Sequence, residues 1–144
     1  MGNYSDIQQI LNTHLSEMDS LTVSNPILWK RENLDLTPEE NETYIESMVI
    51  PAETDYPNIG LSGFKVLAGT FAIHVKETRY QGWGNFSLLV DEIIEHFPRN
   101  LVLTNGDGTI NVKILKTYPM GGFYDSDGRY TIPVHIRYDS YISY

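Results

Sequence analysis

Hydrophobic residues near the start of the chain recur at helical spacing, at Ile7, Ile10, Leu11, Leu15 and Met18. This pattern predicts an amphipathic helix over about residues 6–18, with one face against a core. Ser5 followed by Gln8 is typical of a capping box at the start of such a helix.

A second helical pattern follows a glycine-rich turn in the middle of the chain. Asn85 is a candidate N-cap for this helix, and Pro98 ends it. The apolar positions between these two residues lie on one helical face, at Phe86, Leu89, Val90, Ile93 and Phe97.

Two-residue alternation predicts strands elsewhere, most clearly over residues 130–138, where every second residue is apolar. Pro133 lacks an N–H group, so we expect this strand to be an edge strand or to carry a bulge. The longest candidate strand is 64–78. Its large apolar residues stand at even positions up to Val66 and at odd positions from Leu67 onward, and this change predicts a bulge near Gly69. Shorter strands are predicted at 25–30, 44–50, 101–103 and 110–114, with a hairpin turn at 105–108.

The predicted elements follow the order α-β-β-β-α-β-β-β. Two amphipathic helices cannot bury their apolar faces alone, but a sheet with one apolar face can cover both. We therefore expect an α+β fold: a two-layer sandwich with a mixed, mostly antiparallel sheet and two helices packed on one face. The 144 residues fit a single domain over residues 1–144.

The amino-acid composition excludes several kinds of site and several classes of protein. The chain has no cysteine, which excludes disulfides, thiolate zinc sites and a thiol nucleophile. No apolar run is long enough to span a membrane, and the first residues have neither the basic flank nor the apolar stretch of a signal peptide. Ten tyrosines in an acidic, cysteine-free chain are typical of a module that contacts other proteins.

The charge is negative and unevenly distributed. The formal net charge of −9 disfavours specific binding to DNA, because such binding gains affinity from cations that neutralise phosphates. Between Glu32 and Phe64 there are eight carboxylates and no lysine or arginine. We expect this stretch to form an extended acidic arm at about residues 31–63.

Residues that could carry chemistry do not converge in the sequence. His74 and His135 are expected on one sheet face, but no third metal ligand accompanies them. Asp91, Glu92 and Glu95 are explained by a solvated helix face. The turns at 105–108 and 125–128 lack the full ligand set of a calcium loop. We therefore predict no catalytic residue, no metal and no cofactor.

Cations gather on one face of the predicted sheet, opposite the apolar face, at His74, Lys76, Lys113, His135 and Arg137. We hypothesise that the acidic arm of one subunit lies on this face of a neighbour. Such a contact between unlike patches is heterologous, and it gives a ring when it closes. The alternative is a monomer in which face and arm are both exposed. The candidate interface residues are Glu39, Glu40, Glu42, Lys76, Lys113 and Arg137.

Three groups of residues, in this order and spacing, resemble one family. The first is NPILW at 25–29 with YIE at 44–46 and VIPA at 49–52. The second is GTFAIHV at 69–75, followed by Gly82, Gly84 and the helix that ends at His96 and Phe97. The third is YTIPVHIRY at 130–138. Together they are similar to the tail-terminator (tail-completion) proteins of long-tailed bacteriophages of the lambda type.

This resemblance implies a structural protein of the virion, without catalytic residues. It implies a homo-hexameric ring that caps the head-proximal end of the tail tube, stops tube polymerisation and offers a docking surface for the head or its connector. Its partners would be further copies of itself, the tail tube protein and the head-tail connector or stopper protein, with DNA passing through the lumen without specific binding. It would act in the host cytoplasm during assembly and then in the phage tail.

Two alternatives stay open. A neck or head-tail connector protein would share the structural role but cap a different partner. A small enzyme or ligand-binding domain would need convergent polar groups in a pocket, which the sequence does not reveal.

Overall fold

The structure is a computed structural model that describes residues 3–23, 28–30, 43–52, 64–77, 83–126 and 128–143. Its helices are α1 (Asn3–Ser16), α2 (Asp19–Thr22) and α3 (Trp83–His96). Its strands are β1 (Leu28–Lys30), β2 (Tyr44–Pro51), β3 (Phe64–Glu77), β4 (Val102–Thr104), β5 (Ile110–Pro119), β6 (Phe123–Tyr124) and β7 (Tyr130–Ser143).

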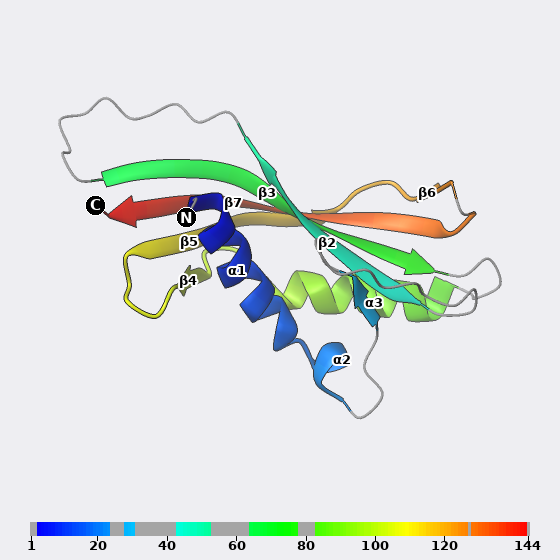
Figure 1. The fold of residues 1–144 in the computed structure, drawn as a ribbon. Coiled ribbons are helices and arrows are strands. Elements are labelled where there is room, and N and C mark those ends of the chain that lie inside the picture. Colours follow the sequence, from blue (N-terminus) through cyan, green and yellow to red (C-terminus); the bar gives the residue numbers. More distant parts are fainter. Residues whose placement is uncertain are drawn as a thin grey trace.

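The described strands form one seven-stranded sheet in the order β1-β2-β3-β7-β5-β4, with β6 also paired to β7. The β1–β2 pair is parallel, and every other pair is antiparallel. The long strands β3 and β7 run side by side through the middle of the sheet (Figure 1). A sheet of this kind can bury one face and leave the other to solvent.

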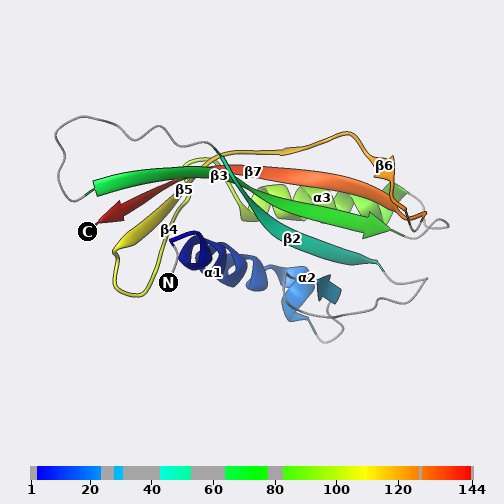
Figure 2. The same ribbon diagram turned by 45° about the horizontal axis from the view of Figure 1, so that its top comes forward.

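Helices α1 and α3 both lie on the concave face of the curled sheet (Figure 2). The helical positions predicted from spacing are buried there, except Phe86, whose side chain lies outside the described set. They join the inward residues of β3, β5 and β7 in one hydrophobic cluster. Burial of these apolar side chains, each contributing about 1.5–3 kcal/mol, is the main stabilising term.

The α+β class and the mostly antiparallel sheet are therefore confirmed. The strong curl and the two additional short elements, α2 and β6, depart from the simple two-layer arrangement and element order predicted above. Both predicted helices also begin earlier than expected. Ser5 and Asn85 lie inside α1 and α3, so neither is an N-cap. The earlier start of α1 brings Tyr4 against the hydrophobic core.

The bulge predicted near Gly69 is wrong. The pairing of β3 with β7 is continuous through this position, and the regular pairing of β3 with β2 extends to Pro51 opposite Gly69. Gly69 instead makes room for a ring: a Cβ atom placed there would lie 2.5 Å from the hydroxyl oxygen of Tyr138. The bulge that does occur is in β5, between Ile114 and Lys116.

Pro133 lies in a central strand, so the prediction of an edge or a bulge at this residue is also wrong. The Met120 N–H donates to the Pro133 carbonyl at 2.7 Å, so the backbone polar groups of Pro133 face the β5 and β6 side. Strand β5 ends at Pro119 and β6 starts at Phe123. The missing N–H of Pro133 therefore falls at this break between two strands, where it interrupts no ladder.

Much of the predicted acidic arm lies outside the described residues. Residues 43–52 belong to β2 and its flanks, while 31–42 and 53–63 are not described. Glu39, Glu40 and Glu42 fall in the undescribed part, so their place at an interface stays a prediction.

Candidate functional site

The face of the sheet opposite α1 and α3, here called the outer face, carries no described helix (Figure 2). Directly paired residues of antiparallel strands point to the same side of a sheet. Lys76 pairs with Thr131, and His74 pairs with Pro133. Arg137 pairs with Thr70 of β3, and Lys113 pairs with Asp139. The register thus brings the predicted cations, with His135, to the outer face.

At one end of this face Lys76 is already paired within its own chain. Its Nζ lies 2.8 Å from Asp125 Oδ2 and 3.9 Å from Glu46 Oε2. Burial alone would lower the pKa of Lys76, but the hydrogen bond to Asp125 and the nearby negative charges raise it overall. We call Glu46, Lys76 and Asp125 the ion-pair cluster.

The turn after β6 holds Asp125 in this position. Asp125 Oδ1 accepts a hydrogen bond from the Arg129 N–H at 2.9 Å, and Gly128 supplies the left-handed backbone of the turn, with φ of 77°. The Arg129 guanidinium carbon lies 4.9 Å from the centroid of the Tyr44 ring. This end of the outer face is thus closed by contacts between β2, β3 and the β6–β7 turn.

His74 lies beside the ion-pair cluster on β3. Burial lowers the pKa of His74, and the charge of Lys76 lowers it further. His74 and His135 share the outer face, as the sequence predicted. Within the described residues, no group of three or more histidine or acidic side chains could hold a metal ion.

Farther along the outer face lie three more cations, on β5 and β7. The β5 bulge places Lys116 directly opposite Arg137, and Tyr118 directly opposite His135. We call Lys113, Lys116 and Arg137 the cation patch. Among the described residues, the ion pairs within 4.0 Å involve none of these three side chains. Lys116 Nζ instead lies 5.0 Å from the centroid of the Tyr118 ring.

Lys116 and Tyr118 are residues that sequence analysis missed. Simple alternation from Ile110 through Ile114 would turn Lys116 toward the core. The bulge reverses the parity, so Thr117 faces inward opposite Ile136 and Lys116 faces outward. A lysine at an expected core position was the signal that could have located the bulge.

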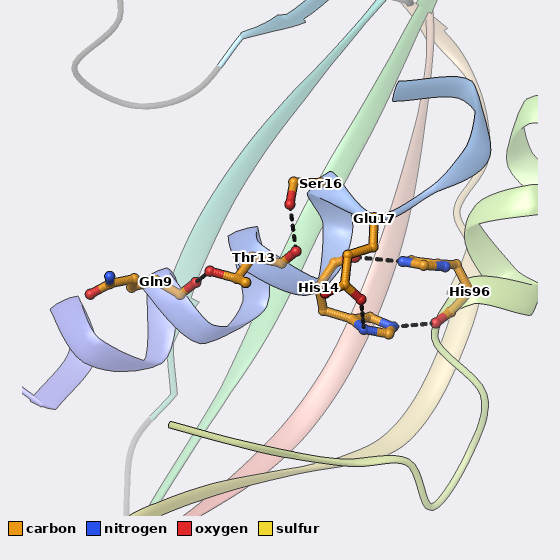
Figure 3. A network of polar contacts seen from close by, with 6 residues as sticks. All are labelled: Gln9, Thr13, His14, Ser16, Glu17 and His96. Atoms are coloured by element: carbon orange, nitrogen blue, oxygen red, sulfur yellow. Dashed lines mark hydrogen bonds and ion pairs between the residues drawn. The ribbon is translucent and has the colours of Figure 1, made fainter. Parts of the chain in front are cut away.

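On the concave side, histidines join the ends of α1 and α3. The His14 and His96 rings stack with their centroids 4.1 Å apart. With the proton on Nε2, His14 donates to the His96 carbonyl at 2.6 Å, and His96 donates to the His14 carbonyl at 2.5 Å (Figure 3). Burial lowers the pKa of His14, although the hydrogen bond to the His96 carbonyl and, to a smaller extent, the Glu17 carboxylate oppose this. These two histidines lock the helices together.

Glu92 also connects two helices, beyond the solvated role predicted for it. One oxygen accepts a hydrogen bond from the Ser20 N–H at 2.9 Å, and the other accepts from the Ser20 hydroxyl. Asp91 and Glu95 are exposed, as predicted. The described polar groups therefore join the helices on the concave side, and cations lie on the outer face. No helix in the described part is long and apolar enough to cross a membrane.

Comparisons with known proteins give the family. A search of curated proteins gives no match. Several solved structures match, and one of them, whose name states no function, has a TM-score of 0.66 at 20% identity, covering 92% of this chain and 94% of that chain. At this identity the likeness shows the fold alone. A family model described as phage tail terminator protein matches residues 6–138. This match spans the helices, the sheet and both ends of the outer face, and the chain belongs to the phage tail terminator protein family.

Proposed function

We propose that this protein forms a homo-hexameric ring on the head-proximal end of the tail tube, where it stops tube polymerisation and provides the docking surface for the head or its connector. The observation that carries the proposal is the family match over residues 6–138. The protein acts through shape and charge and transforms no molecule. It assembles in the host cytoplasm and stays in the virion.

The size of the chain supports a ring around DNA. A compact chain of this length has a radius of gyration of roughly 14–15 Å, and six such bodies in contact enclose an opening of about 35–40 Å. A duplex fits through this opening. The net charge of −9 means that the wall would not hold phosphates, so DNA passes without specific binding.

The outer face supports a heterologous contact between neighbouring subunits. In this contact the acidic arm of one copy, with Glu39, Glu40 and Glu42, meets cations of the next. Lys76 was among the cations expected there, but its own chain already supplies its carboxylates. Lys113 and Arg137 are therefore the better candidates, because the described residues leave both without an ion pair.

Tube assembly tests the function directly. Purified tail tube protein is polymerised with and without this protein, and tube lengths are measured by electron microscopy. We expect the protein to shorten the tubes and to appear at one tube end as a six-fold cap. Unchanged tube lengths together with binding to an isolated head connector would instead indicate a neck protein.

A further inference from the structure

We propose that the cation patch is a carboxylate-binding surface, and that its occupant is the acidic segment between Glu32 and Asp55 of a second copy of this chain. This inference rests on the ring proposed above and deepens it. It identifies the side chains that hold one subunit to the next, including Lys116, which the sequence did not indicate.

The first argument is the unfavourable pairing of Lys116 with Arg137. These two cations are direct cross-strand partners on β5 and β7. Like charges in this position repel one another and destabilise a sheet. The pairing arises only because of the β5 bulge, a local departure from regular register. A carboxylate that binds between the two side chains removes the repulsion, so the isolated subunit is primed for an acidic partner.

The second argument is the surroundings of this pair. Asp139 is the cross-strand partner of Lys113, so it offsets the charge of that lysine. No described carboxylate lies within 4.0 Å of Lys116 or Arg137. The Tyr118 ring beside Lys116 Nζ restrains the lysine side chain, which lowers the entropy lost when it binds a carboxylate.

The third argument concerns the occupant. The chain contains eight carboxylates and no cation between Glu32 and Phe64. Glu46 is one of the eight, and it already belongs to the ion-pair cluster of its own chain. The other seven make this segment the complement of the cation patch in charge. Complementary charge across an interface favours encounter and fixes the register of the two partners.

Zero-length cross-linking tests the contact. Equal amounts of unlabelled and ¹⁵N-labelled protein are mixed with purified tail tube protein, and a carbodiimide then joins carboxylates to lysine amines in contact. We expect mixed-isotope links between Lys113 or Lys116 and a carboxylate of residues 32–55. Links confined to one isotope, or links from the cation patch to the tube protein, would overturn the inference.

Charge-swapped variants provide a second test, read by sedimentation of the rings assembled on tube ends. Lys116→Glu/Arg137→Glu and Glu39→Lys/Glu40→Lys/Glu42→Lys should each weaken subunit association at least tenfold. An equal mixture of the two variants should recover it, because both kinds of contact are then complementary. Arg99→Glu, which changes an exposed cation outside the cation patch, should have no effect.

The two proposals can fail separately. If wild-type protein does not shorten tubes, the terminator function is wrong. If the Lys116→Glu/Arg137→Glu variant still caps tubes as a hexamer, or if mixing restores nothing while circular dichroism shows both variants folded, the terminator function stands and the carboxylate-binding surface is wrong.

Discussion

The two faces of the sheet treat polar groups differently. On the concave side, the polar groups that join the helices are paired within the chain: His14 and His96 exchange hydrogen bonds, and Glu92 accepts hydrogen bonds from Ser20. On the outer face, the ion-pair cluster is likewise paired within the chain. At the cation patch, Lys116 and Arg137 oppose one another without an acidic partner among the described residues.

This difference separates residues that stabilise the subunit from residues available to a partner. A charge that is paired inside the chain contributes to the stability of the subunit, and its removal leaves the other charge buried. A charge opposed by a like charge opposes folding slightly, and it becomes favourable only when a counter-charge arrives. Substitution of a paired charge should therefore lower the stability of the subunit, whereas substitution of one member of a like-charge pair should raise it.

The largest effect is expected on the concave face, where packing is tight. Gly69→Ala would place a methyl group 2.5 Å from the Tyr138 hydroxyl oxygen and 2.9 Å from the Ile50 carbonyl oxygen. We expect a loss of about 3 kcal/mol in the free energy of unfolding, which is the upper end of the range for overpacked sites. The loss is large because the Ile50 carbonyl belongs to the backbone and cannot move aside easily. Urea denaturation followed by circular dichroism measures this loss.

Two further variants check the cause. Gly106→Ala should change the unfolding free energy little, because nothing lies within 4 Å of a Cβ atom there. Tyr138→Phe should recover part of the loss in the Gly69→Ala background, since it removes the nearest atom. An equal loss with and without the Tyr138 hydroxyl would contradict this explanation.

A smaller loss is expected at the ion-pair cluster. Asp125→Ala removes the hydrogen-bonded partner of Lys76, whose side chain is only 13% exposed. The expected destabilisation is about 2 kcal/mol, typical of a hydrogen bond to a charged group. Asp91→Ala, at an exposed carboxylate, serves as the control and should be nearly neutral. Equal losses for the two substitutions would show that Asp125 stabilises the subunit no more than an exposed carboxylate does.

The histidine contact between α1 and α3 should make stability depend on pH. The folded-state pKa of His14 lies below its ordinary value of 6.5, mainly because of burial. The unfolded chain then binds more protons in mildly acidic solution, so this contribution to stability is complete above about pH 6.5 and is lost as the pH falls.

His14→Gln provides the measurement. We expect it to cost about 1 kcal/mol at pH 7.5 through the lost hydrogen bond, and less at pH 5.0. Burial lowers the pKa of His74 as well, so the relevant quantity is the difference between wild type and variant at each pH. A difference that stays constant between the two pH values would rule out His14 as the titrating group.

The smallest effect, with the opposite sign, is expected at the like-charge pair of the cation patch, Lys116 and Arg137. Lys116→Gln removes the repulsion from Arg137, so the isolated subunit should gain about 0.5 kcal/mol of stability at low salt. Lys113→Gln is the matched control: it faces Asp139 and should lose a similar amount. Thermal unfolding of the isolated subunit at low and high salt measures both changes. The same sign for both would show that the cation patch is ordinary surface.

The core and the order of the long elements were predictable because each depends on local pattern. The helical positions from Ile7 to Met18 are buried as their spacing predicted. The expected position of His74 and Lys76 on the face opposite the apolar one also agrees with the register, because side chains alternate along a strand. The predicted hairpin turn at 105–108 also agrees with the structure: it joins the antiparallel strands β4 and β5, and Gly108 adopts φ of 73° there, while Gly106 does not have a positive φ.

The errors arose where a position depends on a distant neighbour. The pattern within its own strand predicts a bulge near Gly69, but Tyr138 on another strand explains this glycine. The missing N–H predicts an edge or a bulge at Pro133, but the break between β5 and β6 accommodates this residue in a central strand. The histidine contact joins residues 82 positions apart, and no spacing rule connects them.

From its sequence alone this protein could be identified as an acidic α+β domain, because amphipathic periodicity, charge and turn residues are properties of short segments. The resemblance to tail terminators rested instead on three groups of residues in their order and spacing. The tertiary structure decided which charges meet. It paired Lys76 with Asp125, and through one inserted residue in β5 it set Lys116 against Arg137. Register between strands is a long-range property, and a single bulge reverses every side chain that follows it.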